Sequence, residues 1–378
     1  MKIAIEKKTL WAVTAVTAVL VLLVLTMLRN GSSENDTSIT LVNGVFTTPY
    51  IEGGVSYLIP PKEIYDVGLL ASDIPALTNP AFTTVAAMDK LLADDVYGID
   101  VVVNGTHRFY ADQILNWHQV VNDVGAFSDG QTLVVVHDPL SGTSVAFSAS
   151  TTFAASGKVY NDTLLMEDTS GTLWLASRGE AVVGEKVGEM LTPYPSQSMP
   201  WSVWKAFYPN GDVLSNETGF TRDYTRHPYG DYEMAHTLMF PINTSDDRLQ
   251  PKTTIDGLNI GGEQLAISRG LMTAAHVVND VVGGTAIVAM YSDDAKITTV
   301  FAAKVGDAVL TFTYNAEISR TTDNETGSVW SVDGLCISGT LRGTQLDVVN
   351  APEMYWFAWA AAYPETRVNP NATVAAMK

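Results

Sequence analysis

The sequence predicts a mainly β fold of the β-rich α+β class. It consists of two internally repeated β units with short covering helices, preceded by an N-terminal transmembrane helix. Three observations support this prediction. Strand-like apolar runs separated by Asn-Gly or Gly-Gly turns fill much of the chain. Three segments recur in the same order about 155 residues further on, which indicates a duplicated domain rather than a solenoid. Residues 10–28 contain no charged side chain.

The composition is that of a globular protein with an acidic surface. With 378 residues, 46% of them apolar, the chain is long enough for two domains that each bury a core. The formal net charge is −19, and the 22 Lys and Arg residues are scattered along the chain. This pattern argues against a nucleic-acid partner, which requires a cationic surface. Solubility in a salty medium explains the acidic balance, with weak cation binding as the alternative.

The N-terminus predicts a single-pass anchor in the cell membrane. A helix over residues 10–28 has roughly the length of the hydrocarbon core of a bilayer. Lys2, Lys7 and Lys8 precede it, so residues 1–9 form a cytoplasmic tail and the bulk of the chain is extracytoplasmic. A cleaved signal peptide is the alternative, but the run exceeds about 15 residues and no Ala-x-Ala site follows it. Residues 29–50 are predicted to form a flexible stalk.

Asn-x-Ser/Thr acceptor sequences agree with export. Eight occur in the chain, whereas about three are expected by chance. Six candidate glycosylation sites lie beyond the stalk, at Asn104, Asn161, Asn216, Asn243, Asn324 and Asn371. The single cysteine, Cys336, has small or apolar neighbours and is predicted to be a buried hydrophobe. An exported, glycosylated chain without an intrachain disulfide fits an archaeal envelope.

The internal repeat divides the exported part into units at 51–240 and 241–378. The matching pairs are Val120–Val124 with Val277–Val281, Gly171–Trp174 with Gly327–Trp330, and Trp201–Pro209 with Trp356–Pro364. Each unit opens with a predicted hairpin, Tyr97–Tyr110 around Asn104-Gly105 and Thr254–Ile267 around Gly261-Gly262. Buried strands follow at 133–136 and 286–290, with partner strands at 144–147 and 298–301.

Two helices are predicted in the first unit. One covers Asp112–Val124, with Ile114, Trp117 and Val121 on its apolar face. The other covers Met199–Tyr208 and ends before Pro209. The Trp pairs of the repeated segment, Trp201/Trp204 and Trp356/Trp359, are predicted to be core anchors. Helices of this length cover one face of a sheet without changing the β-rich class.

His118 and Asn122 are the first candidates for chemistry. On the predicted helix they lie one turn apart beside the apolar stripe, where a half-buried His suits a general base or a metal ligand. A His that only hydrogen-bonds a neighbouring loop is the favoured alternative. Ala274 or Ala275 stands at the equivalent position of the second copy, so any site belongs to the first unit.

The turn His137–Thr143 supplies the other candidates. His137 and Asp138 could join His118 around a divalent metal ion, although no His-x-x-x-His spacing supports this. A nucleophilic triad of Ser141, His118 and Asp123 is also conceivable, but no Gly-x-Ser-x-Gly elbow surrounds Ser141. The same residues are common turn formers, which is the simpler interpretation. The polar-aromatic segment 221–232 is predicted to be an ordered connector between the units, with a binding loop as the alternative.

Taken together, these segments resemble a family known as domain of unknown function 3179, found in bacteria and archaea. The segments that carry the resemblance are Ile74–Pro80, Ile114–His118, Asn122-Asp123, Ser156-Gly157, Trp174, Gly179–Ala181, Pro195–Gln197, Arg222–Tyr224, Pro228–Gly230 and Phe240-Pro241. The family usually has Cys-Pro-Leu-Cys-Gly-Thr where this chain has Asp138-Pro139-Leu140-Ser141-Gly142-Thr143. Asp and Ser cannot form a disulfide or bind a soft metal, so the resemblance implies a member that is degenerate at this site.

The predicted function is therefore that of a membrane-anchored binding or structural surface protein that carries glycans. The alternative is a metal-dependent or redox-related enzyme with its site around His118, His137 and Asp138. The resemblance names no established activity, and the sequence does not identify a ligand, a substrate or a protein partner.

Overall fold

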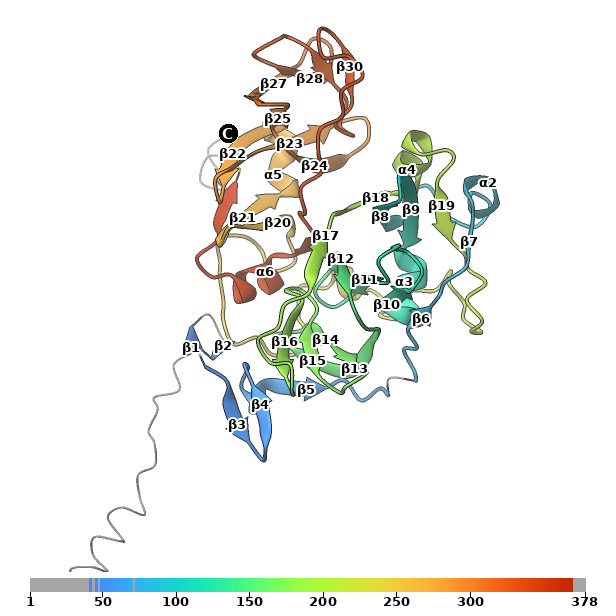
Figure 1. Cartoon of the computed structure of the whole chain (residues 1–378), viewed down its shortest axis with the longest axis vertical. Helices are drawn as coiled ribbons and strands as arrows, with labels where there is room; N and C mark the ends of the chain where they lie inside the picture. The colour runs from blue at the N-terminus through green and yellow to red at the C-terminus, as the bar shows by residue number, and fades with distance from the viewer. Residues whose placement is uncertain (1–40, 43–44, 47, 71, 370–378) are drawn as a thin grey trace, which may run out of the picture. The chain divides into compact units, whose positions relative to one another are not determined.

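The protein is mainly β in its computed structural model, as the sequence predicts (Figure 1). The structure describes residues 41–42, 45–46, 48–70 and 72–369. The predicted cytoplasmic tail, the anchor at 10–28 and most of the stalk lie outside the described residues. No helix within the described ranges is long and apolar enough to cross a membrane. At the end of the predicted stalk, β1 (Leu41–Val42) pairs with β2 (Val45–Phe46).

The first predicted hairpin is confirmed. β8 (Tyr97–Val103) pairs with β9 (Thr106–Ala111), and Asn104 and Gly105 turn the chain with φ of 51° and 79°. Helix α3 (Asp112–His118) follows directly and packs against both strands through Ile114 and Leu115, which are fully buried.

The predicted helix over 112–124 is wrong beyond His118. Gln119 has a left-handed φ of 56°, which an α-helix cannot continue. The following Val120–Asp123 form strand β10, where the β-branched Val120 and Val121 pack in a sheet, and pair with β11 (Thr132–Asp138). Asn122 therefore does not share a helical face with His118.

The remaining elements of the first unit form three sheets with the hairpin and β10. The predicted pair β11 and β12 (Thr143–Ala149) is confirmed. β13 (Phe153–Tyr160), β14 (Thr163–Asp168), β15 (Leu173–Leu175) and β16 (Glu180–Val183) join β3 (Tyr50–Glu52), β4 (Val55–Tyr57) and β5 (Ile64–Asp66) in a seven-stranded sheet. β6 (Leu77–Thr78) pairs with β10, β17 (Thr192–Tyr194) with β12, and β7 (Phe82–Thr84), followed by α2 (Val85–Met88), with β19 (Asp212–Leu214).

The first unit closes with a strand, a helix and a strand. β18 (Ser196–Pro200) pairs with β8, α4 (Trp201–Phe207) follows, and β19 pairs parallel with β9. The predicted helix at 199–208 is thus confirmed with slightly narrower bounds. Trp201 and Trp204 are fully buried, as expected of core anchors, and both pack against Phe109.

The same order of elements follows in the second half of the chain. β20 (Thr254–Ile260) and β21 (Glu263–Ser268) form the second predicted hairpin, and α5 (Arg269–Ala275) follows. β22 (Val277–Val282), β23 (Thr285–Ser292) and β24 (Ile297–Ala302) then make an antiparallel sheet. β31 (Glu353–Tyr355) pairs with β20, α6 (Trp356–Ala362) follows, and β32 (Arg367–Asn369) pairs parallel with β21.

Short strands link the two parts of this second half. They are β25 (Lys304–Val305), β26 (Ala308–Val309), β27 (Phe312–Asn315), β28 (Arg320–Asp323), β29 (Val329–Trp330) and β30 (Cys336–Ser338). Cys336 is 1% exposed, in line with the expected buried hydrophobe.

Two side-chain devices occur at equivalent places in both halves. Asn122 accepts from the backbone N–H of Phe153 and donates to its carbonyl, both at 2.8 Å. Asn279 makes the same two bonds, at the same distances, with Phe312. An Asp–Trp bond is likewise repeated, from Trp174 to Asp168 and from Trp330 to Asp323. The recurrent residues in the sequence are therefore those that fix the backbone of each half.

The two halves share one sheet. β31 pairs with β20 on one side and, through Glu353, with Ser144 of β12 on the other. This contact creates a sheet that runs β32, β21, β20, β31, β12, β11, β10 and β6, with β17 beside β12. The residues that line its junction consequently come from distant parts of the sequence.

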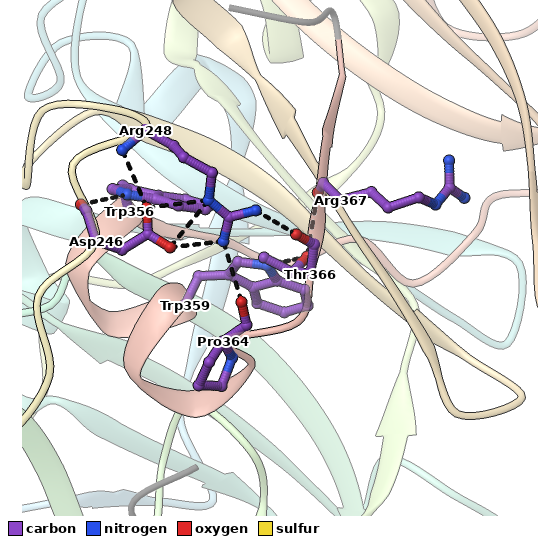
Figure 2. Close-up of polar contacts among 7 residues, drawn as sticks. All are labelled: Asp246, Arg248, Trp356, Trp359, Pro364, Thr366 and Arg367. Carbon is purple, nitrogen blue, oxygen red and sulfur yellow. Dashed lines mark hydrogen bonds and ion pairs between the residues drawn. The ribbon is translucent and has the colours of Figure 1, made fainter.

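We call residues 221–248, which link the two halves and include the predicted connector 221–232, the connector. Its 3₁₀ turn η2 (Tyr232–Met234) is anchored by the Tyr232 hydroxyl, which donates to Asp162 at 2.8 Å. Further on, the Arg248 guanidinium bonds Asp246 and the Thr366 carbonyl and lies 5.0 Å from the centre of the Trp356 ring (Figure 2). The connector is thus fastened to the first half at one end and to α6 at the other.

Replacing Asn122 and replacing its equivalent Asn279 should lower the free energy of unfolding by different amounts. Asn122 is 1% exposed, so Asn122→Ala leaves a buried N–H and a buried carbonyl unsatisfied and should lower the free energy of unfolding by about 2–4 kcal/mol. Asn279 is exposed, water can replace its bonds, and Asn279→Ala should cost about 1 kcal/mol. Urea denaturation measures both. Equal losses at 122 and 279 would contradict this account.

Candidate functional site

His118 links the end of α3 to the connector by hydrogen bonds. The side chain is fully buried at the end of α3, with Nδ1 2.7 Å from the Pro75 carbonyl and Nε2 2.7 Å from the Tyr224 hydroxyl. Because a carbonyl can only accept, Nδ1 carries the proton and Nε2 accepts from Tyr224. Burial lowers the pKa of His118, which favours this neutral form. These contacts agree with the favoured alternative, in which His118 only hydrogen-bonds neighbouring loops.

The predicted triad is not assembled. Asp123 forms an ion pair with Arg108, and the Ser141 hydroxyl donates to Asp138 at 2.5 Å rather than to an imidazole. Both ring nitrogens of His118 are occupied by Pro75 and Tyr224, as described above. Asn122, the other catalytic candidate, uses its amide on the Phe153 backbone. Each candidate therefore has a structural partner of its own.

The three predicted metal ligands also have separate partners. Asp138 is fully buried and accepts from the Ser141 hydroxyl and from the backbone N–H groups of Leu140 and Leu164. His137 contacts Asn116 and Ser144 rather than His118. Among the residues that the structure describes, no group of three or more His, Cys, Asp or Glu side chains could hold a metal ion.

His137 instead opens onto a large cavity between the two halves. The cavity has a volume of about 770 Å³. We call it the inter-repeat cavity. Its lining consists of Asp95, Val96, Tyr97, Asp112, Gln113, Asn116, His137, Pro139, Gly142, His227, Glu233, Thr253, Thr254, Arg269, Gly270, Thr273, Tyr291, Lys296, Thr298, Glu353 and Tyr355. A hollow of this size holds a ligand of ordinary metabolite dimensions.

Equivalent positions of the two halves face this cavity. α3 contributes Asp112, Gln113 and Asn116, and α5 contributes the residues at the same helical positions, Arg269, Gly270 and Thr273. His137 and Tyr291 are also equivalent. Each donates its backbone N–H to the residue with positive φ that ends the helix, at 2.9 Å to Gln119 and at 2.7 Å to His276. The two halves thus line the cavity with equivalent helical positions that carry different side chains.

Asp112 is an acid of the lining that burial strongly perturbs. It is the first residue of α3, 20% of its side chain is exposed, and its buried Oδ1 has no hydrogen-bond partner. Burial and the nearby Glu233 carboxylate raise the pKa of Asp112 to about 8. The carboxyl is consequently protonated for the most part at neutral pH.

His137 is the basic residue beside this carboxyl, at a distance too long for a hydrogen bond. Its Nδ1 lies 3.0 Å from the Ser144 hydroxyl and 3.7 Å from Oδ1 of Asp112, and its Nε2 lies 3.2 Å from Oδ1 of Asn116. Since the Asn116 oxygen accepts, Nε2 carries the proton and Nδ1 presents a lone pair. Burial lowers the pKa of His137, so the imidazole is neutral. His137 is thus neutral and satisfied by Ser144 and Asn116, while Oδ1 of Asp112 has no hydrogen-bond partner.

The opposite wall is a closed ion-pair cluster. Arg269 donates to Asp256 at 2.6 Å and to Glu353 at 2.7 Å. These two carboxylates neutralise the guanidinium, so it leaves no free positive charge for Asp112. The inter-repeat cavity therefore has an excess of acidic groups.

Asp112, Arg269 and Glu353 were not among the sequence candidates. Asp112 stands at the start of a predicted helix, where an acidic residue is ordinary. The available signal was the alignment of the copies, which places Asp112 opposite Arg269 and reverses the charge at one position of an otherwise similar helix. That signal depends on a helix boundary placed to within one residue.

Asp112 predicts a pH dependence of stability. Its pKa is about 8 in the folded state and about 3.9 in an unfolded chain, so the folded state binds the extra proton between these values. Stability is lost as pH rises through this window, by up to about 1.4 kcal/mol per pH unit from one group. Asp112→Asn should make the decline in the free energy of unfolding between pH 5 and pH 8 shallower, as measured by urea denaturation.

A matched control is Asp223→Asn. Asp223 lies on the connector, and hydrogen bonds from Thr225 lower its pKa, so it titrates below this window. Asp162, whose pKa burial raises to about 7, contributes in the same direction as Asp112 and should leave a residual slope in the Asp112 variant. An unchanged slope in Asp112→Asn would show that Asp112 does not titrate in this range.

Comparison with known proteins gives a family but no activity. No curated protein and no solved structure matches the chain. A family model described as "Protein of unknown function (DUF3179)" matches residues 71–366, which is most of the chain and includes every residue of the inter-repeat cavity. The chain belongs to the DUF3179 family.

Proposed function

We propose that this chain is a membrane-anchored, extracytoplasmic binding protein that takes a small organic cation into its inter-repeat cavity. The observation that carries the proposal is the Asp112 carboxyl, which lines the cavity and whose Oδ1 has no hydrogen-bond partner. An acid in this position is uncharged while the site is empty and becomes a charged partner once a cation replaces the lost solvation.

The other groups of the lining favour the same ligand class. Glu233 lies near enough to Asp112 to raise its pKa, and so adds negative potential. Tyr97, Tyr291 and Tyr355 contribute aromatic rings, which attract quaternary and primary ammonium groups through their π faces. An anionic ligand would meet the Glu233 carboxylate, while the buried Arg269 of the lining is already neutralised by Asp256 and Glu353.

The duplicated architecture supports a binding role. We infer two repeated β units, 51–240 and 241–378, because the same elements and the same Asn and Asp–Trp devices occur in both. Large ligand sites occur preferentially where two such bodies meet. Because α3 and α5 have equivalent backbones, side chains on either helix can differ without a change in the shape of the backbone around the site.

Export rests on the sequence of the N-terminus and on the acceptor sequences. Asn104 and Asn324 are exposed, whereas Asn161 is 7% exposed and accepts from the Asn243 backbone N–H. Glycans are therefore proposed at Asn104 and Asn324 rather than at Asn161. The proposed location is the cell membrane of an archaeon, with the bulk of the chain outside.

The alternative, a metal-dependent or redox-related enzyme around His118, His137 and Asp138, has less support. Its three residues donate to or accept from separate protein groups. At the family's Cys-Pro-Leu-Cys position, the Asp138 carboxylate and the Ser141 hydroxyl hydrogen-bond to each other, an arrangement that explains a stable turn without redox chemistry.

Choline and its neutral isostere 3,3-dimethyl-1-butanol test the binding proposal. The two molecules differ by a charged nitrogen in place of a carbon. Isothermal titration of the full-length chain at pH 8 should show choline binding at least tenfold tighter than the isostere. Choline should also bind more tightly at pH 8.5 than at pH 6.5, because binding must release the Asp112 proton.

Asp112→Asn is the decisive variant. It keeps the size of the side chain and should remove both the preference for choline and its pH dependence. Asp223→Asn, on the exposed part of the connector, should change neither. Equal affinity for choline and the isostere, or an unaltered preference in Asp112→Asn, would rule out the proposed cation site.

Membrane anchoring has its own test. The native chain should sediment with membranes and resist extraction by carbonate, and removal of residues 1–28 should release it. Mass spectrometry of the native protein should find glycans at Asn104 and Asn324 and none at Asn161. A chain recovered intact in the soluble fraction would contradict the anchor, and modified Asn161 would contradict the burial argument.

A further inference from the structure

A second, smaller cavity lies beneath the connector. It has a volume of about 140 Å³ and does not share a residue with the inter-repeat cavity. We call it the connector cavity. Its lining is Val67, Leu69, Ile74, Gln119, Asp138, Leu140, Gly157, Lys158, Val159, Leu164, Tyr229, Met239 and Phe240. Most of these side chains are apolar, so an apolar body of six or seven heavy atoms would fit, as benzene does in cavities of about 150 Å³.

The polar end of the connector cavity has an unmet acceptor. Gln119 is 3% exposed, its Nε2 donates to the Tyr229 hydroxyl at 2.8 Å, and its Oε1 is buried without a partner. Leaving such an oxygen unsatisfied costs about 1–3 kcal/mol. The Tyr229 hydroxyl accepts from Gln119 and keeps its own proton to donate. Gln119 and Tyr229 together present one acceptor and one donor.

Asp138 leaves no free carboxylate oxygen for a ligand at this end of the cavity. Its two oxygens already accept from Leu140, Leu164 and Ser141, and the side chain is fully buried. A carboxylate ligand would lose its hydration in this mostly apolar space. An ammonium ligand would lose its hydration in a mostly apolar space and find the carboxylate oxygens occupied.

The equivalent place in the second half shows that the backbone does not require this arrangement. His276 has the same left-handed φ as Gln119, 59° against 56°. Its side chain, however, stacks on Tyr314 and bonds Asp293 at 2.8 Å, on the exposed side of the second sheet. The unpartnered Gln119 oxygen is thus a property of the side chain at 119 and of the connector that covers it.

The connector forms the cover of the cavity through Tyr229, Met239 and Phe240. Asp162 fixes this stretch, since it accepts from the Tyr232 hydroxyl and from the backbone N–H groups of Met239 and Phe240. Met239 is 51% exposed, which places it at the rim. A ligand in the cavity would therefore contact both the first β unit and the segment that leads to the second.

We propose that the connector cavity binds a small neutral molecule with a hydroxyl or primary amide head and a short apolar tail. The head donates to Gln119 Oε1 and accepts from the Tyr229 hydroxyl, and the tail lies among Ile74, Val159 and Leu164. This site is separate from the cation site and does not depend on it.

Four linear probes with five carbon atoms each test the proposal: 1-pentanol, pentanamide, pentanoate and pentylammonium. Thermal unfolding of the full-length chain is measured against probe concentration. Pentanol and pentanamide should raise the Tm in a saturable manner, and pentanoate and pentylammonium should bind at least tenfold more weakly. Tighter binding of either charged probe, or no saturable shift with the neutral ones, would overturn the proposal.

Variants separate the polar head from the cavity. Gln119→Met keeps the length of the side chain without its oxygen and should weaken pentanol binding at least tenfold. Leu69→Phe, at a rim position that is 46% exposed, should block the cavity without disturbing the core. Neither variant should alter choline binding, which reports on the fold. Identical pentanol titrations in wild type and Gln119→Met would exclude the assigned head group site.

Discussion

The joined sheet depends on one buried ion-pair cluster. Arg269, at the start of α5, holds Asp256 of β20 and Glu353 of β31. Glu353 is also the residue through which β31 pairs with β12 of the first half. Removing one partner would leave an uncompensated buried charge, which is far more costly than the pair is favourable. The position of β31, and with it the wall of the inter-repeat cavity, is thus set by electrostatics rather than by apolar packing alone.

This cluster also explains why the two faces of the inter-repeat cavity differ. In the second half, Arg269 at the start of α5 forms ion pairs with two carboxylates, Asp256 and Glu353. In the first half, the equivalent Asp112 has only the neutral His137 beside its Oδ1, and burial and the Glu233 carboxylate raise its pKa. The two halves have the same order of elements here, but the acid at the start of α3 is not paired with a cation as Arg269 is paired with its carboxylates. This asymmetry is the reason that the proposed cation site depends on Asp112 and not on the residues that the sequence suggested.

Much of the fold was predictable because its signals are local. The Asn-Gly and Gly-Gly hairpins, the paired strands after them and the buried Trp helix all depend on residues close in sequence. The helix over 112–124 failed where two principles competed. The apolar spacing of Ile114, Trp117 and Val121 has a helical period, but the β-branched Val120-Val121 pair and the left-handed Gln119 favour a strand. That boundary decides which side chains reach a cavity.

The candidate site was harder to predict for the same reason. His118, Asp123, Asp138 and Ser141 were chosen because they are chemically versatile and close in sequence, yet each is held by a separate partner. Asp112, Arg269 and Glu353 come together only through the pairing of β31 with β12, a contact between residues about 200 positions apart that no local pattern encodes.

The turn that carries Asp138 and Ser141 is also bound to the second half. A Cβ on Gly142 would lie 2.9 Å from the Tyr355 ring, and the Ser141 carbonyl accepts from the Tyr355 backbone N–H at 2.8 Å. Neither half can therefore rearrange at this point without displacing the other. Any substitution in this turn must therefore also fit a strand from the other half of the chain, so the two halves cannot be altered independently at this contact.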